Sequence, residues 1–298
     1  MEQVNQILVA VQPYVLLIFV YATMIAIGFT ITIKQLVVSF KRPLPLILCL
    51  LFNIIVAPLI ASLITNGLAA SFGSKAEATT IIIAAVLINL FAGAPAGMKN
   101  VQLGGGDGAS AVAMLTLLSI AVVIFTPFTA PLFLPGDVTI PVAKIVWTLI
   151  ILVVIPLGIG LTLNSVKPNI AKKALKSVNE ISSISMILVL VCFMLPNLQS
   201  VFDTGLYALS VFGIIVLANF FITYFCTVGT IQDKKTVSLL SMSKNFGVAL
   251  SVATAAFASY DIIPAMMTYA IVMMIACIPV ALILKHVTGE KVALTRKS

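Results

Sequence analysis

The segment Ser241-Met-Ser-Lys-Asn-Phe-Gly247 decides how this chain is built, because it places a lysine inside an otherwise apolar stretch. The segment Gly93-Ala-Pro-Ala-Gly-Met-Lys-Asn100 has the same arrangement earlier in the chain, with lysine again followed by asparagine. A lysine at the bilayer centre costs about 2.5–3.5 kcal/mol, so such residues usually face a cavity or a partner. Glycine and proline inside a span free backbone groups, which are tolerated only in protein or beside water. We therefore predict two interrupted membrane helices at these segments.

The composition of the whole chain places these segments in a membrane. The 298 residues are 61% hydrophobic and 9% charged, whereas a soluble domain typically has about 25% charged residues. So little polar surface cannot cover so apolar a chain, and lipid must solvate part of it. The net charge of +8 is spread over short loops and the C-terminal tail, a pattern that indicates membrane orientation and not nucleic-acid binding.

Apolar runs of about 20 residues, the length of a spanning helix, predict an all-α polytopic membrane protein with about nine spans. They lie at 10–33, 43–66, 78–103, 108–134, 140–164, 177–200, 204–230, 235–258 and 262–286. Thirteen of the seventeen Lys and Arg residues sort to one side of the membrane and two to the other, with Lys99 and Lys244 inside spans. The positive-inside rule then predicts an external N-terminus and a cytoplasmic C-terminus in the cell membrane.

The two interrupted segments occupy matching places among the predicted spans. One is the third span and the other is the next to last, and one further span follows each before its half ends. Secondary transporters use interrupted helices in two halves to build a site near the bilayer midplane. We therefore predict one transporter domain over 1–298, with inverted repeats at about 10–134 and 140–286 and the first helix of the first repeat absent.

Enzymatic chemistry has little to draw on in this sequence. The four cysteines lie in apolar runs, and the single histidine, His286, sits at the end of the last run. No Ser-His-Asp set, metal cluster or phosphate-binding loop can be assembled from these residues. We therefore expect a protein that is not an enzyme and that holds neither a metal nor a cofactor.

Several passages, in order along the chain, resemble the bile acid:sodium symporter (BASS) family. They are the stretch from Gly28 to Pro43, Asn53-Ile-Ile-Val-Ala-Pro58, the segment 93–100 with Gly108-Ala-Ser-Ala-Val-Ala113, and Lys244-Asn-Phe-Gly-Val-Ala249. The resemblance covers nearly the whole chain. It implies interleaved core and panel helices, two broken helices crossing at the substrate site, and uptake of an organic anion by alternating access.

Departures from the family pattern concern its two sodium sites. The resemblance places the following residues at family positions that supply a serine, a glutamine, a glutamate and two hydroxyls: Lys99, Lys244, Leu240, Ala113 and Leu117. An ammonium group donates three hydrogen bonds and carries the charge of one sodium ion. We therefore predict that Lys99 and Lys244 replace the two sodium ions, so that transport is sodium-independent or coupled to protons.

Other polar residues are expected around these lysines. Asn100 and Asn245 are predicted crossover caps and substrate ligands. Supporting roles are predicted for Asn53, which matches a sodium-site glutamine of the family, and for Asn89, Asp107, Thr116, Ser119 and Ser243. The alternatives are N-capping for Asp107 and packing or backbone hydrogen bonding for the two hydroxyl residues of 108–134.

The leading interpretation is a secondary carrier of a small organic anion, since two buried cations and helix N-termini favour a carboxylate. An arsenite efflux carrier of related fold is the first alternative. Such carriers use a crossover cysteine, and none of the four cysteines lies in either interrupted segment. A non-coupled channel or receptor-like membrane protein is the second alternative.

Overall fold

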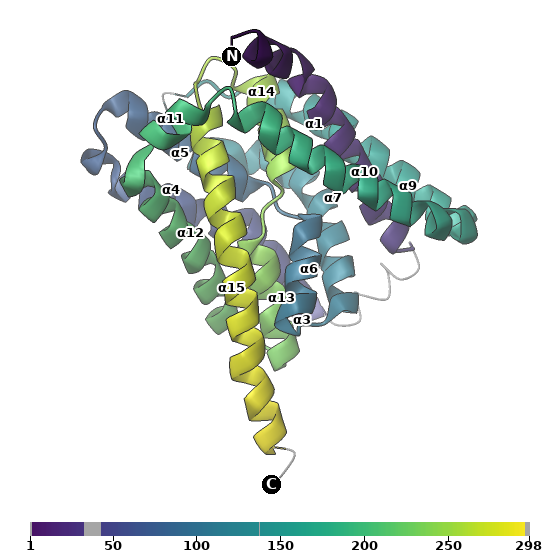
Figure 1. Ribbon diagram of the computed structural model, residues 1–298. Coiled ribbons are helices and arrows are strands. Elements are labelled where there is room, and N and C mark those ends of the chain that lie inside the picture. Colours follow the sequence, from purple (N-terminus) through teal and green to yellow (C-terminus); the bar gives the residue numbers. More distant parts are fainter. Residues whose placement is uncertain (1, 33–42, 137, 296–298) are drawn as a thin grey trace.

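The computed structural model describes residues 2–32, 43–136 and 138–295. These residues form helices joined by short connections, and no strand occurs among them, so the predicted all-α fold is confirmed. In Figure 1, α1 begins at one end of the bundle and α15 ends at the opposite end. Several predicted loop residues lie outside the described residues: Lys34, Lys41, Arg42, Asp137, Arg296 and Lys297.

Seven helical units in the described part of the chain are long and apolar enough to cross a membrane. Two of them contain a π-helical turn between α-helical parts. The units are α1 (Glu2–Thr30), α3–η1–α4 (Pro43–Leu51, Phe52–Val56, Ala57–Gly67), α7 (Gly108–Phe133), α8–η3–α9 (Val142–Leu149, Ile150–Val154, Ile155–Val166), α10 (Pro168–Met194), α12 (Gly205–Cys226) and α15 (Ile263–Thr295). The short helices η2 (Ala69–Ser71) and α11 (Leu198–Asp203) lie in connections.

Two further units are broken, as predicted for the interrupted segments. The helices α5 (Lys75–Leu90) and α6 (Pro95–Gly104) bend by 73° at residues 91–94 and together form an eighth candidate span. The helices α13 (Ile231–Met242) and α14 (Phe246–Ala256) are separated at residues 243–245. Neither helix is among those of the described chain that are long and apolar enough to cross a membrane. Length and apolarity therefore do not confirm the expected ninth span. Its first half is polar and mostly buried, and a helix enclosed by protein needs no apolar surface for lipid.

Some helix boundaries differ from the predicted spans. Helix α1 begins at Glu2 and not near 10, and α10 begins at Pro168 and not near 177. Proline is favoured in the first turn of a helix because its missing N–H has no partner to lose there. Apolar length marks only the part of a helix that lipid covers, so polar extensions of this kind escape a search for apolar runs.

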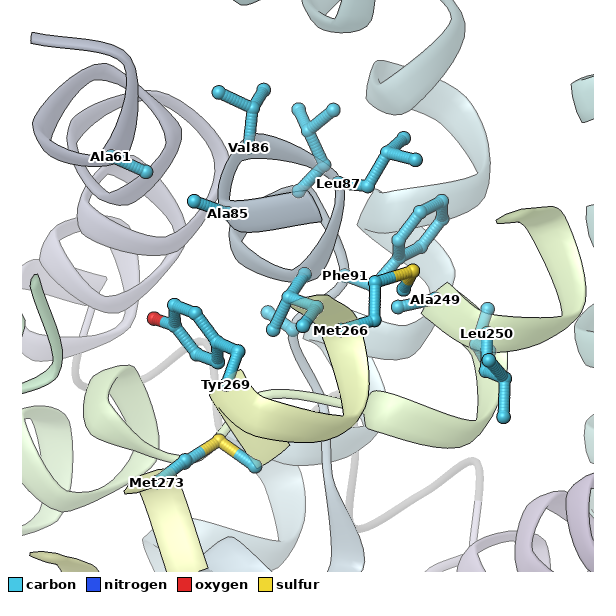
Figure 2. Close-up of a cluster of buried hydrophobic side chains, with 14 of the residues drawn as sticks. Ala61, Ala85, Val86, Leu87, Phe91, Ala249, Leu250, Met266, Tyr269 and Met273 are labelled. Atoms are coloured by element: carbon cyan, nitrogen blue, oxygen red, sulfur yellow. The ribbon is translucent and has the colours of Figure 1, made fainter. Parts of the chain in front are cut away.

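The helices form two packing groups. Helix α1 lies along α9 and α10, and glycines bring α1 and α9 into backbone contact, since a Cβ on Gly28 would lie 2.7 Å from the Cα of Gly160. The other group surrounds α5, which is buried throughout residues 81–90. Figure 2 shows part of this core, where Phe91 lies beside Met266 of α15 and Ala249 of α14. The grouping is consistent with the predicted panel and core and with inverted repeats.

Candidate functional site

The two helix breaks are joined by hydrogen bonds from Asn245. Its backbone N–H donates to the carbonyl of Phe91 at 2.7 Å, and its Nδ2 donates to the carbonyl of Gly93 at 3.3 Å. Its Oδ1 accepts from the N–H of Val248 at 3.3 Å and so caps the start of α14. Asn245 therefore caps the helix that follows the second break and bonds to the backbone of the first break. We call this contact between the two breaks the crossover.

The first break depends on glycine at position 93. Gly93 has a φ of +84°, in the left-handed region that side chains disfavour. A Cβ at this position would also lie 2.7 Å from the Oγ of Ser119 and 3.1 Å from its backbone nitrogen. Ser119 donates its hydroxyl to the carbonyl of Leu115 at 3.0 Å. This serine therefore packs against the break while bonding to its own helix.

The second break contains a buried lysine with an amide partner. Lys244 is 2% exposed, and its Nζ donates to the Oδ1 of Asn53 at 3.0 Å. The Nδ2 of Asn53 donates in turn to the Oγ of Ser241 at 2.8 Å and to the carbonyl of Cys49 at 2.9 Å. Both polar ends of the Asn53 side chain are thus used, and its orientation is determined by α13 and by the lysine.

A π-helical turn positions Asn53 for this contact. The turn covers Phe52–Val56, and the N–H of Ala57 bonds to the carbonyl of Phe52, five residues back. Pro58 follows and has no N–H for the regular α-helical ladder. Such wide turns inside α-helices are frequent at functional sites, and this one places an asparagine against the break in another span.

The charge of Lys244 has no anionic partner among the described residues. Their ion pairs include Lys176 with Glu180 at 3.9 Å, an exposed pair on α10, but none with Lys244. Leu240 is buried and contacts α6, since a Cβ on Gly97 would lie 3.1 Å from its Cδ2. The site therefore offers a buried ammonium, amide and hydroxyl groups, and no carboxylate to neutralise the ammonium.

Lys99 lies on a different face of α6 from the residues that contact α13. Asn100 donates its Nδ2 to the Oγ of Ser243 at 3.0 Å, and Gly97 lies against the same serine. Lys99 is exposed and forms no hydrogen bond or ion pair with the residues that the structure describes. The structure thus brings Asn100 and Ser243 to the second break but leaves Lys99 apart from Lys244.

The remaining predicted residues form local or separate contacts. Asp107 caps α7, with its Oδ1 accepting from the N–H of Ala109 at 3.0 Å. Thr116 is buried and donates to the carbonyl of Val112 at 2.9 Å. Asn89 is buried in another cluster, where its Nδ2 donates to the hydroxyl of Tyr269 at 2.8 Å.

Comparison with known proteins places the chain in a family. The Sodium Bile acid symporter family matches it over residues 15–204. The chain belongs to this family. A probable sodium/metabolite cotransporter, BASS3 of Arabidopsis thaliana chloroplasts, is 27% identical over 142 residues, which are 48% of this chain and 31% of that protein. The chain thus spans about a third of that relative, and it belongs to a family of multi-pass membrane transporters and not of enzymes.

This member of the Sodium Bile acid symporter family has sulfur atoms around its second break. The Sδ of Met273 accepts from the N–H of Lys244 at 3.2 Å, and the Sγ of Cys277 lies 3.8 Å from the Oγ of Ser243. The Sγ of Cys49 lies 3.8 Å from the Nδ2 of Asn53. None of the four cysteines lies within either interrupted segment, but Cys49 and Cys277 lie beside the second break in space.

Sequence reasoning missed three residues of these polar clusters in the Sodium Bile acid symporter fold. They are Ser241, Asn219 and Tyr269, which contact Asn53 or Asn89. Ser241 had a usable signal, because it is a polar residue only three positions before Lys244 in the second interrupted segment. The other two lie in long apolar runs where a single polar residue is usually a helix–helix contact.

Proposed function

We propose that this protein is a secondary active transporter of a small organic anion, a carboxylate, which it moves by alternating access. The observation that carries the proposal is Lys244, a buried ammonium whose described partner is the neutral amide of Asn53. A buried charge without a counter-charge costs free energy. A bound carboxylate would supply that counter-charge, and binding would then stabilise the protein.

The same lysine supports sodium independence. The resemblance places family sodium-site side chains at Asn53 and Lys244, and these two residues bond to each other here. The ammonium therefore lies where the Oδ1 of Asn53 is oriented to receive a cation. Leu240 offers no carboxylate to a sodium ion at this place. We propose that Lys244 supplies the charge that relatives obtain from sodium, so that transport is sodium-independent or coupled to protons.

Lys99 is proposed to act at the surface of the crossover. It is exposed on α6, one residue before Asn100, which bonds to Ser243 of the second break. In this conformation its ammonium is open to an arriving anion and is not enclosed like that of Lys244. Its proposed role is thus to attract and first contact the substrate, and it stands in for the second sodium charge.

The proposed location is the cell membrane, with the N-terminus outside and the C-terminus in the cytoplasm. The support is the distribution of Lys and Arg over the predicted loops. The start of α1 and the end of α15 lie at opposite ends of the bundle, as this orientation requires (Figure 1).

A thermal-shift screen tests the proposal. The purified protein is heated with individual carboxylate metabolites, in sodium chloride and in choline chloride at equal ionic strength. A ligand present at 100 times its Kd stabilises the folded state by about 2.7 kcal/mol. We expect at least one carboxylate to raise the melting temperature equally in both salts, and Lys244→Ala to abolish the shift.

The outcomes separate the alternatives. Stabilisation that requires sodium would contradict the sodium independence but not the carboxylate specificity. Stabilisation by arsenite and by no carboxylate would favour the arsenite carrier. Uptake into proteoliposomes that does not saturate with substrate concentration would favour a channel.

A further inference from the structure

A second buried cluster joins three helices away from Lys244. The Nδ2 of Asn219, on α12, donates to the Oδ1 of Asn89 at 2.9 Å, and the Nδ2 of Asn89, on α5, donates to the hydroxyl of Tyr269 at 2.8 Å. Tyr269 projects from α15, near the apolar core drawn in Figure 2. All three side chains are at most 1% exposed. Three helices of the group around α5 are therefore joined by hydrogen bonds between side chains, in addition to their apolar packing.

This cluster matches the Asn53 cluster in its place along the chain. Asn53 lies in the span before α5 and α6, and Asn219 lies in the span before α13 and α14. Asn53 donates to Ser241, the second-last residue of α13, and Asn219 donates to Asn89, the second-last residue of α5. Each asparagine therefore holds the helix that leads into the break of the other half, as two inverted repeats would require.

The two clusters differ in what the asparagine oxygen binds. The Oδ1 of Asn53 accepts a hydrogen bond from the ammonium of Lys244. No donor among the described residues forms a hydrogen bond with the Oδ1 of Asn219. An unsatisfied buried acceptor costs about 1–3 kcal/mol. The hydroxyl of Tyr269 accepts from Asn89, and no described acceptor takes its own proton. The two partners of Asn89 thus supply one acceptor without a described donor, on Asn219, and one donor without a described acceptor, on Tyr269.

We propose that Asn219, Asn89 and Tyr269 position the first break as Asn53 and Ser241 position the second, and that the Oδ1 of Asn219 binds a water molecule where the Oδ1 of Asn53 binds an ammonium. A water that accepts from Tyr269 and donates to Asn219 satisfies both groups, which is the usual role of buried water. A sodium ion fits less well, because the cluster has neutral ligands and no carboxylate, and buried charge requires compensation.

The asymmetry has a mechanical consequence. The Asn53 cluster, which positions the second break, contains a charge-assisted hydrogen bond, and such bonds are roughly twice as strong as neutral ones. The cluster of Asn219, Asn89 and Tyr269, which positions the first break, consists of neutral groups and the proposed exchangeable water. The first break is thus the one that opens more readily, independently of which anion the protein carries.

Hydrogen exchange of the purified protein tests this positioning role. We expect Asn219→Leu to speed amide exchange in a peptide covering 86–98 about tenfold, the effect of losing roughly one hydrogen bond, while a peptide covering 238–250 keeps its wild-type rate. Asn53→Leu is expected to have the converse effect. Asn197→Leu is the matched control, since its amide bonds to the carbonyl of Phe193 one turn back, and it should change neither peptide.

Two further arms keep the proposal open to refutation. Tyr269→Phe removes one hydroxyl and should speed exchange in the 86–98 peptide alone, even where Asn219→Leu fails to fold. Equal acceleration of both peptides, or of neither, would overturn the positioning role. Protection of the 86–98 peptide by sodium chloride relative to choline chloride, lost in Asn219→Leu, would overturn the water in favour of a sodium ion, whatever the thermal-shift screen for carboxylates shows.

Discussion

Lys244 and Asn53 form a buried hydrogen bond of 3.0 Å between residues 191 positions apart in the chain. The bond connects the break between α13 and α14 with a π-helical turn in an early span. It replaces water around an ammonium group by one amide oxygen, which satisfies one of its three N–H donors. The ammonium therefore retains the capacity to bind an anion at the crossover.

Removing the amide is expected to leave the lysine charge without its described partner. Asn53→Leu should lower the free energy of unfolding by about 1.5–3 kcal/mol, the range for hydrogen bonds to charged groups. The measurement is the unfolding midpoint of the purified protein. The variant Lys244→Met should suppress much of this loss when combined with Asn53→Leu, because the unpaired charge is then gone. Strict additivity of the two substitutions would contradict their coupling.

The first break is expected to be intolerant of a side chain. Gly93→Ala adds a Cβ at a positive φ and within 2.7 Å of the Oγ of Ser119. Left-handed backbone costs about 1–2 kcal/mol for a non-glycine residue, and overpacking adds about 1–3 kcal/mol. We expect a lower melting temperature and weaker carboxylate binding. The control is Gly136→Ala, where nothing lies within 4 Å of the added Cβ.

Close contact between α1 and α9 predicts a second glycine requirement. Gly28→Ala places a Cβ 2.6 Å from the backbone nitrogen of Leu161, which cannot move aside as a side chain can. The helices must separate, at a cost of about 1–3 kcal/mol. Gly158→Ala on α9 meets nothing within 4 Å and serves as control. Comparable melting temperatures for the two variants would show that the helices do not approach this closely.

The exposed lysine should contribute differently from the buried one. Lys99→Gln is expected to leave the melting temperature of the unliganded protein nearly unchanged, since the side chain has no described partner. Carboxylate binding should weaken by about 0.3–1 kcal/mol, or two- to fivefold, as for other exposed charges, and the difference should shrink at high salt. Isothermal titration calorimetry at two salt concentrations measures the weaker binding and its dependence on salt. A loss of binding as complete as in Lys244→Ala would mean that Lys99 is enclosed when the anion is bound.

Much of the architecture was predictable because it follows from local properties of the chain. Apolar runs indicated the spans, and glycine and proline inside them indicated the two breaks, since both free backbone groups of a helix. The lysines indicated that these segments face protein or a cavity, since charge is costly in lipid. The polar helix α13 was harder to classify, because its burial by other helices, and not its composition, allows Asp233 and Lys235 to lie there.

The sequence alone determined that this protein is a helical membrane protein with two interrupted helices, because helix length and the cost of polar groups in lipid depend on neighbours along the chain. Only the tertiary structure decided that Lys244 is enclosed and Lys99 exposed. Each α-helical residue is rotated by about 100° from the last, so the face that carries Asn100 toward Ser243 carries Lys99 away from α13. The choice of that face, and the meeting of Asn53 with Lys244, depend on packing between spans far apart in the chain.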